Sequence, residues 1–296
     1  MLKKVKYDKS AFLFLLPAVI IILFIYANPL VKIFWYSVVN WDGLQPTTEF
    51  SGASNFITVI SNKYFFEILF NNLIVIIITI PAVILFALFC SQFIYLRIFG
   101  YKIYQYLFFL PVIIPNVVAA IIWTFFLHPT GPINTIFTKI GLDFLVVDWF
   151  GNPRFAIYGL IITIIWKEVG FATILFLARL SGVDPSLYDS AKIDGANDFQ
   201  TIRYITIPQL KGVIRLFAII QMIGLLNFLF GYIYIMTRGG PGYSSTLLEY
   251  FVYIYAFTFK KLGPANAVAV ILFGITFIFV LLYFWLSRSE GEGELN

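Results

Sequence analysis

Residues 181–212 of the chain read SGVDPSLYDSAKIDGANDFQTIRYITIPQLKG and form a polar island between two long apolar segments. Asp184 followed by Pro185 predicts a helix start, because Asp caps free backbone amides and Pro is pre-set for the first helical turn. Residues 186–193 then follow an amphipathic pattern. The side chains expected on one side of this short helix are Leu187, Tyr188 and Ala191.

The same polar stretch predicts a sharp turn and a second short helix. Asp194 and Gly195 predict the end of the first helix, since an Asp-Gly pair is typical of a turn. Residues 196–207 are expected to form the second helix, which Pro208 ends because proline cannot continue a regular helix. Two such helices at a membrane face would form a projecting knob that a soluble partner could grip.

The order of residues in this stretch resembles the EAA loop of bacterial ABC-importer permeases. The matching residues are Tyr188, Asp189, Ser190, Ala191, Asp194, Gly195, Ala196, Phe199, Ile205 and Pro208. The fuller pattern, residues 185–208, is similar to the carbohydrate-uptake branch related to maltose-type permeases. It departs from that pattern with Asp189 where Glu is usual and Ser190 where the first Ala is usual. We call residues 181–212 the coupling loop.

The composition of the 296-residue chain indicates an integral membrane protein. It is 60% hydrophobic and only 12% charged, whereas soluble domains carry about 25% charged residues. Repeated apolar runs of roughly 20 residues have the length at which a helix spans a bilayer. The expected fold class is therefore all-α and polytopic, with about six transmembrane helices and no room for a soluble catalytic domain.

The apolar runs divide the chain into predicted spans. They cover residues 11–31, 68–95, 103–127, 155–180, 213–236 and 264–286. A secretory signal is the alternative for the first run, but its length and the lack of a small-residue cleavage site favour an uncleaved span. Pro111 and Pro115 should kink or unwind the third span and free backbone carbonyls that a neighbour must satisfy. A helix on the outer face is expected over residues 247–259.

The distribution of Lys and Arg sets the expected orientation. With the N-terminus in the cytoplasm, 12 of the 20 Lys and Arg residues lie in cytoplasmic segments and 6 in external ones. This bias favours cytoplasmic N and C termini and a cytoplasmic coupling loop. The expected organisation is a cytoplasmic N-terminal segment (1–10), a six-helix transmembrane permease domain (11–287) that includes the coupling loop, and a cytoplasmic tail (288–296).

Several function classes find no support in the sequence. No basic patch is interleaved with exposed aromatic residues, which disfavours nucleic-acid binding despite the net charge of +5. The single histidine, His128, and the single cysteine, Cys90, offer no catalytic or metal-binding cluster. The phosphate-binding pattern GxxxxGK(S/T) is also missing from the sequence. The chain is therefore expected not to be an enzyme and to bind no cofactor itself.

The resemblance implies a mechanical role for the coupling loop. In the family, this loop seats in a cleft of a cytoplasmic ATPase, whose closure moves the attached spans. The residues implied in that contact here are Tyr188, Asp189, Ala191, Asp194, Gly195, Ala196 and Phe199. The alternative is an amphipathic helix resting on lipid headgroups. Four Asp residues outnumber Lys192 and Arg203, however, and an anionic leaflet would repel them.

Lys167 and Glu168 lie near the middle of the fourth predicted span. A charge there costs roughly 2.5–3.5 kcal/mol on insertion scales, so neither side chain should face lipid. Neighbours in sequence point in different directions from a helix and do not pair with each other. At least one of them is therefore expected to line the translocation pathway or a polar subunit interface. The alternative is a structural salt bridge to another span.

The resemblance places the sugar between the fourth and fifth spans, near mid-membrane. Further stretches that carry it are Asn40–Gly43, Leu110-Pro111 with Trp123, Trp166 with Gly170-Phe171, and Met236-Thr237 with Gly239–Pro241. The implied pathway candidates are Lys167, Val169, Gly170, Thr173, Gln221, Met222, Leu225, Leu226, Asn227 and Leu229. Helix packing is the alternative explanation for the aliphatic members of this set.

The function implied by the resemblance is that of a permease subunit of an ATP-driven bacterial importer for a sugar or oligosaccharide. Its implied partners are a second homologous permease, two cytoplasmic ATPases that hold ATP and Mg, an extracellular solute-binding protein and the lipid of the bacterial inner membrane. One alternative is an importer of glycerol phosphate or another polar metabolite, for which Lys167 leaves room. Another is an ion-coupled secondary transporter, which should have internal repeats that this sequence lacks.

Overall fold

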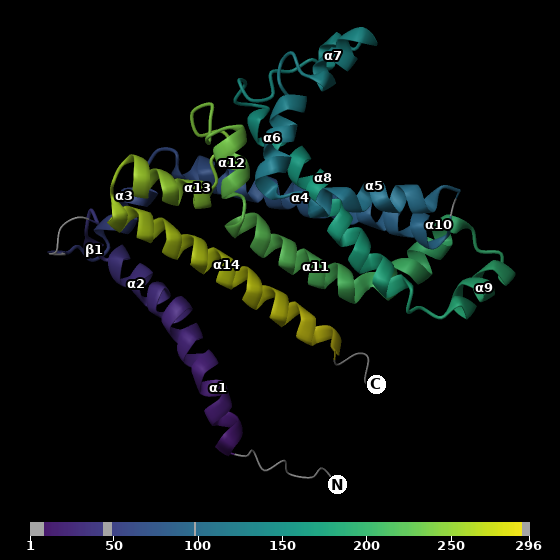
Figure 1. Cartoon of the computed structure of the whole chain (residues 1–296), viewed down its shortest axis with the longest axis horizontal. Coiled ribbons are helices and arrows are strands. Elements are labelled where there is room, and N and C mark those ends of the chain that lie inside the picture. The colour runs from purple at the N-terminus through teal and green to yellow at the C-terminus, as the bar shows by residue number, and fades with distance from the viewer. Residues whose placement is uncertain (1–8, 44–48, 98, 292–296) are drawn as a thin grey trace. The chain divides into compact units, whose positions relative to one another are not determined.

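The computed structural model describes residues 9–43, 49–97 and 99–291, which are mostly helical (Figure 1). Most of the predicted N-terminal segment, residues 1–10, and the end of the predicted tail lie outside the described residues. The helix that contains the last predicted span continues to Gly291, so the described start of the predicted tail is helical. The all-α fold class is thereby confirmed.

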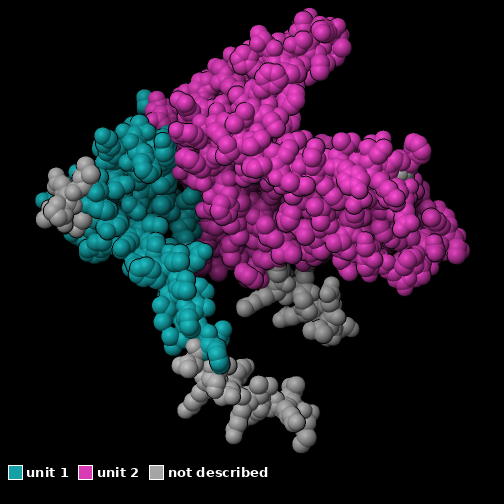
Figure 2. All heavy atoms as spheres, in the orientation of Figure 1, with its two compact units in different colours: residues 1–63, 251–274 teal, residues 64–250, 275–296 magenta. Residues whose placement is uncertain are grey.

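Contacts divide the chain into two compact units, drawn in two colours in Figure 2. Unit 1 comprises residues 1–63 and 251–274, and unit 2 comprises residues 64–250 and 275–296. The coupling loop and the three helices of the main core belong to unit 2, and so the candidate sites are found there.

Unit 1 contains the first apolar helix and a small hairpin. Its elements are α1 (Lys9–Ile22), a π-helical turn (Leu23–Ala27), α2 (Asn28–Ser37), β1 (Val39–Asn40), β2 (Glu49–Phe50) and α3 (Ser54–Ile60). β1 and β2 pair antiparallel, with Val39 opposite Phe50. Asn55 fixes the chain where α2 meets β1, because its Nδ2 donates to the carbonyls of Ser37 at 3.0 Å and Val39 at 2.9 Å.

Unit 2 contains most of the apolar helices. Its elements are α4 (Phe65–Tyr95), α5 (Tyr101–Ile113), α6 (Asn116–Phe126), α7 (Pro132–Lys139), a 3-10 turn (Asp143–Leu145), α8 (Ala156–Leu180), α9 (Pro185–Ile193), α10 (Asp198–Thr201), a π-helical turn (Ile202–Thr206), α11 (Ile207–Asn227) and α12 (Phe230–Met236). The chain continues with α13 (Leu248–Tyr253), a π-helical turn (Ile254–Thr258) and α14 (Leu262–Gly291). The helix predicted over residues 247–259 is thus confirmed as a helix.

The number of candidate membrane spans equals the predicted six when one bent pair of helices is taken as a single span. Five helical segments are long and apolar enough to cross a bilayer: Phe14–Ser37, Phe65–Tyr95, Ala156–Leu180, Asp198–Asn227 and Leu262–Trp285. α5 and α6 pass the same test only together, and they are bent by 109°. The first span runs past its predicted end at residue 31, because the π-helical turn before Pro29 lets the helix continue.

The fifth predicted span, residues 213–236, is wrong at both ends. The helix is already established at Asp198 and stops at Asn227, and α12 follows after a break. Glu249 stabilises this break, because its Oε2 accepts hydrogen bonds from Leu229 N at 2.8 Å and Phe230 N at 3.0 Å. The first amides of a helix have no partner within the helix, so a carboxylate at this position caps α12.

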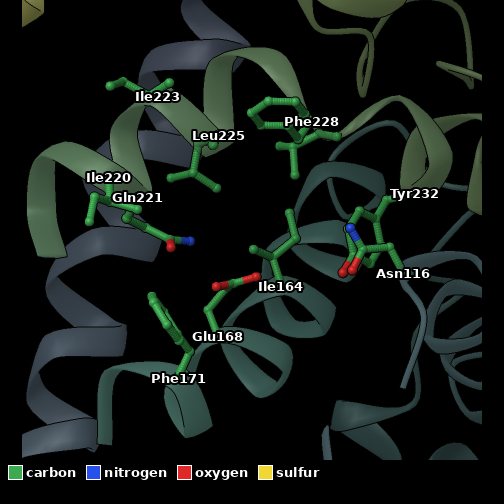
Figure 3. A pocket seen from close by; sticks show the side chains of 12 residues that line it. Asn116, Ile164, Glu168, Phe171, Ile220, Gln221, Ile223, Leu225, Phe228 and Tyr232 are labelled. Atoms are coloured by element: carbon green, nitrogen blue, oxygen red, sulfur yellow. The ribbon is translucent and has the colours of Figure 1, made fainter. Parts of the chain in front are cut away.

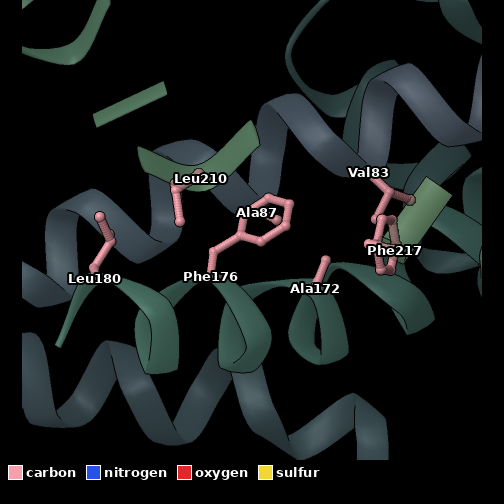
Figure 4. Close-up of a cluster of buried hydrophobic side chains, with 7 residues drawn as sticks. All are labelled: Val83, Ala87, Ala172, Phe176, Leu180, Leu210 and Phe217. Carbon is pink, nitrogen blue, oxygen red and sulfur yellow. The ribbon is translucent and has the colours of Figure 1, made fainter. Parts of the chain in front are cut away.

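The core of unit 2 is formed by α4, α8 and α11. Side chains four residues apart lie on the same face of a helix, and such faces of α4 and α8 pack against one another. The buried cluster contains Val83, Ala87, Ala172, Phe176, Leu180, Leu210 and Phe217 (Figure 4). The rings of Phe176 and Phe217 meet edge to face with centroids 6.1 Å apart. This core joins the two helices that flank the coupling loop.

Candidate functional site

The coupling loop begins with a capped helix, as predicted. Asp184 is the N-cap of α9, and its Oδ1 accepts a hydrogen bond from Ser186 N at 2.9 Å. Hydrogen bonds from Ser186 hold the pKa of the Asp184 carboxyl below its ordinary value. Pro185 occupies the first turn of the helix, where its missing N–H would have had no partner within the helix.

The predicted turn at Gly195 is confirmed by the backbone. Gly195 has a φ of +76°, in the left-handed region that only glycine adopts without strain. Ala196 N donates to Ala191 O at 2.9 Å across this turn, and Gly195 N donates to Lys192 O at 3.1 Å. Such bonds close a helix at a glycine. Nothing lies within 4 Å of the position that a Cβ on Gly195 would take, so the turn faces open space.

The second helix of the coupling loop starts later than predicted. Asn197 and Gln200 form a capping box at the start of α10. Gln200 N donates to Asn197 Oδ1 at 2.9 Å, and Asn197 N donates to Gln200 Oε1 at 2.8 Å. The start predicted at residue 196 is therefore wrong, because the capping pair excludes that residue from the helix.

The predicted end of the second helix at Pro208 is also wrong, because the helix continues as α11. A π-helical turn over Ile202–Thr206 ends two residues before this proline. Proline lacks an N–H and its ring would clash with the carbonyl four residues earlier, so a wider turn accommodates it. The second half of the coupling loop and the span that follows are consequently one helical rod.

Tyr188 and Arg179 tie the coupling loop to the helices beside it. Tyr188 is 9% exposed, its hydroxyl lies 3.3 Å from Thr206 Oγ1, and its ring packs on Tyr95 of α4 with centroids 5.6 Å apart. Arg179 at the end of α8 donates to Gln209 of α11, to the carbonyl and to Oε1, at 3.1 Å in each case. The side chain of Tyr188 therefore anchors α9 to its own chain.

The other predicted coupling residues lie at or near the surface. Asp189, Asp194, Gly195 and Phe199 are exposed, and Ala191 and Ala196 are half-buried. Three large apolar side chains of the loop face solvent: Ile193 is 86% exposed, Phe199 75% and Tyr204 72%. Sequence reasoning named only Phe199. Ile193 and Tyr204 could have been predicted as exposed contact residues, since each is a large apolar residue within a polar stretch.

The third predicted span is broken, as its prolines predicted, and the break lies at Pro115. α5 contains Pro111 and ends at Ile113, and α6 begins after Pro115. In a continuous helix the carbonyl of Val112 would accept from the amide four residues later, and the break removes that donor. Lys167 Nζ of α8 donates to Val112 O at 2.9 Å instead. The buried ammonium of Lys167 thus satisfies a carbonyl that the break leaves free.

α5 and α8 approach one another closely beside this bond. A Cβ on Gly170 would collide with the carbonyl oxygen of Phe108 and lie 2.6 Å from Val112 Cγ2. Gly170 is therefore required by packing between helices. On the other arm of the broken span, the rings of Trp123 and Trp166 meet with centroids 5.8 Å apart.

A cavity of about 330 Å³ opens between α8 and α11. Its lining residues are Asn116, Ile164, Glu168, Phe171, Ile220, Gln221, Ile223, Gly224, Leu225, Phe228, Leu229 and Tyr232. Most of this wall comes from α8 and α11, the two helices that flank the coupling loop. Figure 3 shows the carboxylate of Glu168 and the amide of Gln221 pointing toward one another from these helices.

Three of the predicted pathway residues line the cavity: Gln221, Leu225 and Leu229. Lys167 instead bonds Val112, Gly170 packs on α5, and Val169 packs against the core cluster. The Oγ1 of the fully buried Thr173 donates to Val169 O at 2.7 Å. Asn227 Nδ2 donates to Ile223 O at 2.9 Å, Leu226 is buried, and Met222 is half-buried; none of these three lines the cavity.

At least one of Lys167 and Glu168 was expected to line the translocation pathway or a polar subunit interface. Glu168 lines the cavity, whereas Lys167 bonds Val112, and the pathway role itself stays a prediction. Asn116 and Tyr232, which also line the cavity, were missed. They lie on α6 and α12, and no sequence signal places those elements against the cavity.

In the part of the chain that the structure describes, no group of three or more His, Cys, Asp or Glu side chains could hold a metal ion. His128 Nδ1 lies 3.0 Å from Thr130 Oγ1, in the loop between α6 and α7. Cys90 is buried in α4.

This geometry is that of a multi-pass helical membrane protein with an exposed loop between two of its spans. The chain belongs to the family described as binding-protein-dependent transport system inner membrane component, which matches residues 54–290. This match confirms the predicted family and the multi-pass membrane location.

Relatives match nearly the whole chain. A probable ABC transporter permease protein of Pyrococcus horikoshii is 33% identical over 94% of this chain and 96% of its own length. The diacetylchitobiose uptake system permease protein NgcF of Streptomyces coelicolor is 31% identical over 99% of this chain and 86% of its own length. The crystal structure of a bacterial ABC transporter involved in the import of the acidic polysaccharide alginate matches with 26% identity and a TM-score of 0.79, over 97% of this chain and 98% of that one.

Proposed function

We propose that this chain is a permease subunit of an ATP-driven importer that carries a sugar or oligosaccharide across the bacterial inner membrane. The observation that carries the proposal is that α8 and α11 flank the coupling loop and also supply most of the cavity wall. A force applied to the loop would therefore move the walls of the cavity. Similar proteins include a diacetylchitobiose uptake permease and a bacterial transporter involved in alginate import, which supports a carbohydrate as the substrate.

The coupling loop is suited to a protein partner. Its caps and its glycine turn fix the backbone, while the side chains of Ile193, Phe199 and Tyr204 are left largely exposed. Large exposed apolar side chains on a rigid segment are typical of a protein-binding surface. In this proposal the partner is a cytoplasmic ATPase, which holds ATP and Mg, and the loop faces the cytoplasm in keeping with the distribution of positive charge.

The proposal requires further subunits. One coupling loop serves one ATPase, so two ATPases imply a second, homologous permease with a loop of its own. An extracellular solute-binding protein would deliver the sugar, and a structure of the alginate transporter holds a periplasmic protein with bound alginate pentasaccharide. The N and C termini would both be cytoplasmic. This chain would bind no nucleotide and catalyse no reaction itself.

The internal contacts indicate how motion would spread from the coupling loop. Because the second half of the loop is continuous with α11, displacement of the loop tilts that span as a rod. The bonds from Arg179 to Gln209 make the end of α8 move with it. Closure of the ATPases would then open the cavity to one side of the membrane, and hydrolysis would return it to the other.

The cavity has the chemistry that a sugar requires. Glu168, Gln221 and Asn116 offer hydrogen-bonding groups, and Phe171 and Phe228 offer aromatic surface. Its volume of about 330 Å³ lies at the lower end of small-molecule sites. An importer of glycerol phosphate remains the alternative within the class, but Lys167 does not support it, because its ammonium is directed to the Val112 carbonyl and not to the cavity.

Purification and reconstitution test the proposal. The chain, extracted gently from its native membrane, should copurify with an ATP-hydrolysing subunit and a second permease. In vesicles with the matching binding protein, a sugar should stimulate ATP hydrolysis and accumulate inside. Uptake that follows an ion gradient and continues without ATP would identify a secondary transporter and overturn the proposal.

A further inference from the structure

The cavity contains one carboxyl group, that of Glu168. Of the residues that line it, Glu168 is the only one with a charged side chain. Its carboxylate is half-buried and lies within the cavity (Figure 3). A charge that is partly withdrawn from water acts more strongly than one at the surface, because the local dielectric constant is lower.

The nearest cation in sequence does not reverse this charge. Lys167 is 8% exposed, and its Nζ donates to the Val112 carbonyl on α5. Consecutive residues of a helix point in directions about 100° apart. The ammonium of Lys167 bonds the broken span, while the carboxylate of Glu168 lines the cavity; the two groups are still close enough for an electrostatic interaction.

The groups around Glu168 are neutral and can form hydrogen bonds. Gln221 is 6% exposed and points toward Glu168. Tyr232 is 2% exposed, and its hydroxyl has no hydrogen-bond partner among the described residues. A buried polar atom without a partner carries a free-energy cost, which a hydroxylated ligand that bonded to it would relieve.

We propose that Glu168 makes this cavity selective for charge, so that it passes neutral or amino-substituted sugars and rejects anionic ones such as uronates or sugar phosphates. The carboxylate accepts hydrogen bonds from sugar hydroxyls or from an ammonium group, whereas a carboxylate or phosphate on the solute meets like charge in a poorly solvated space. This inference rests on the proposed function, because it assumes that the cavity is on the path of the sugar.

The selectivity is a property of this chain and does not follow from the fold. The transporter of the acidic polysaccharide alginate has a similar fold, with a TM-score of 0.79. One architecture is therefore compatible with an anionic cargo, and side chains of the cavity must decide which charge is accepted.

A cysteine probe in the cavity measures its charge without any knowledge of the sugar. Gly224 lines the cavity, and a Cβ there meets nothing within 4 Å. Gly224→Cys is introduced in a Cys90→Ser background, in the complete purified importer. Its thiol is then modified by a cationic or an anionic methanethiosulfonate reagent (trimethylammonium-ethyl or sulfonato-ethyl), and each rate is divided by that of a free thiol.

The expected result is a normalised preference of about tenfold for the cationic reagent, since a nearby unit charge changes local ion concentration by such factors. Glu168→Gln should reduce the preference to about one. Gly212→Cys, on the same helix and likewise unobstructed, is the matched control, and Glu168→Gln should leave its ratio unchanged. Equal normalised rates at Gly224→Cys, or a preference that survives Glu168→Gln, would overturn the inference.

A transport assay tests the charge selectivity separately from the proposed function. The reconstituted importer is given glucose-, galactose- and N-acetylglucosamine-based disaccharides and their uronate counterparts, each loaded on the binding protein. The ratio of uronate to neutral uptake should be low in the native protein and should rise about fivefold or more in Glu168→Gln, as expected when a like charge is removed. Sugar uptake with an unchanged ratio would refute the role of Glu168 alone. The absence of uptake for every sugar would refute the proposed function as well.

Discussion

The coupling loop and the cavity are connected by α8 and α11, yet they differ in the origin of their contacts. The hydrogen bonds that cap the two short helices of the coupling loop and close its glycine turn join residues at most five positions apart, as between Asp184 and Ser186 or Asn197 and Gln200. The cavity gathers Asn116, Glu168 and Tyr232 from segments far apart in the chain. A local structure of this kind keeps its shape when a partner pulls on it, whereas a cavity between helices changes shape when the helices move.

The two regions also differ in which side chains they leave exposed. The coupling loop buries Tyr188 and exposes Phe199 and Ile193, which leaves apolar surface for a protein. The cavity encloses Gln221 and Glu168 among apolar side chains, which leaves polar groups for a small solute. Variants that damage one region and spare the other would sharpen this contrast.

Gly195→Val should have the largest effect. The φ of +76° at Gly195 strains any side chain, and a β-branched one most. No neighbour within this chain would clash with the new side chain, so the damage should be to the turn and to the docking of the partner. ATPase copurification and sugar uptake should fall about tenfold or more, which corresponds to a loss of about 1.4 kcal/mol of binding.

Gly212→Val is the control for that change. Gly212 also has open space around its Cβ position, and its φ lies outside the left-handed region. Copurification of the ATPase should remain within about twofold of the native protein, since surface changes away from special backbone sites are usually small. Equal losses in both variants would contradict the special role of the turn.

Glu249→Ala should have the next largest effect, on the stability of the break between α11 and α12. It leaves the amides of Leu229 and Phe230 without their shared acceptor, at a cost of about 2–3 kcal/mol to the free energy of unfolding. A thermal melt of the purified protein measures this. Glu249→Gln keeps an acceptor and should melt near the native protein; a Glu249→Ala variant as stable as the native one would contradict the capping role.

The stability from Glu249 should also depend on pH. Burial raises the pKa of its carboxyl above the ordinary value of 4.5, although the two amides act in the opposite direction. A raised pKa means that the folded state prefers the protonated group. The stability that this group contributes is thus full below pH 4.5 and falls as the pH rises through the raised pKa. The melting temperature of the native protein, compared with that of Glu249→Gln, should follow this course.

Lys167→Met should have a smaller effect, because it removes one hydrogen bond. The carbonyl of Val112 loses its donor, which should cost about 1–2 kcal/mol. The predicted pathway role of Lys167 would require a loss of transport beyond this loss of stability. A melting temperature equal to or above that of the native protein would contradict the assignment of Lys167 to the broken span.

Asp184→Ala should have the smallest effect. It removes the acceptor for Ser186 N at the start of α9, so hydrogen exchange at that amide should become several-fold faster. Asp184→Asn retains an acceptor and should exchange as the native protein does. Because the pKa of Asp184 is lowered in the fold, its contribution is present above the ordinary pKa and is lost as the pH falls below it. Unchanged exchange in Asp184→Ala would mean that the cap is not needed.

The coupling loop depends on local contacts and the cavity on contacts between distant segments, and this difference explains how much of each region could be predicted from the sequence. The cap at Asp184 and the turn at Gly195 were predictable because both follow from residue types that are adjacent in the chain. The end at Pro208 was wrongly predicted because a π-helical turn accommodates that proline. A proline therefore predicts a local distortion more safely than the end of a helix.

The cavity was less predictable because its lining depends on how whole helices are rotated. Apolar residues surround α8 and α11 on all sides, so no periodic pattern indicates which face looks into the cavity. Glu168 could be singled out because a charge in an apolar helix needs a polar environment. Lys167 gave the same signal, and only the break at Pro115 on another helix explains its different partner.

The central claim is that the coupling loop seats in an ATPase, and crosslinking from the loop tests it most directly. A photoreactive benzoylphenylalanine replaces Phe199, an aromatic side chain that is 75% exposed, and the cells are irradiated. We expect one main adduct, between this chain and an ATP-hydrolysing subunit, and its loss when Gly195→Val is added. Adducts with lipid alone, or with a protein on the external side of the membrane, would contradict the proposed contact with the ATPase.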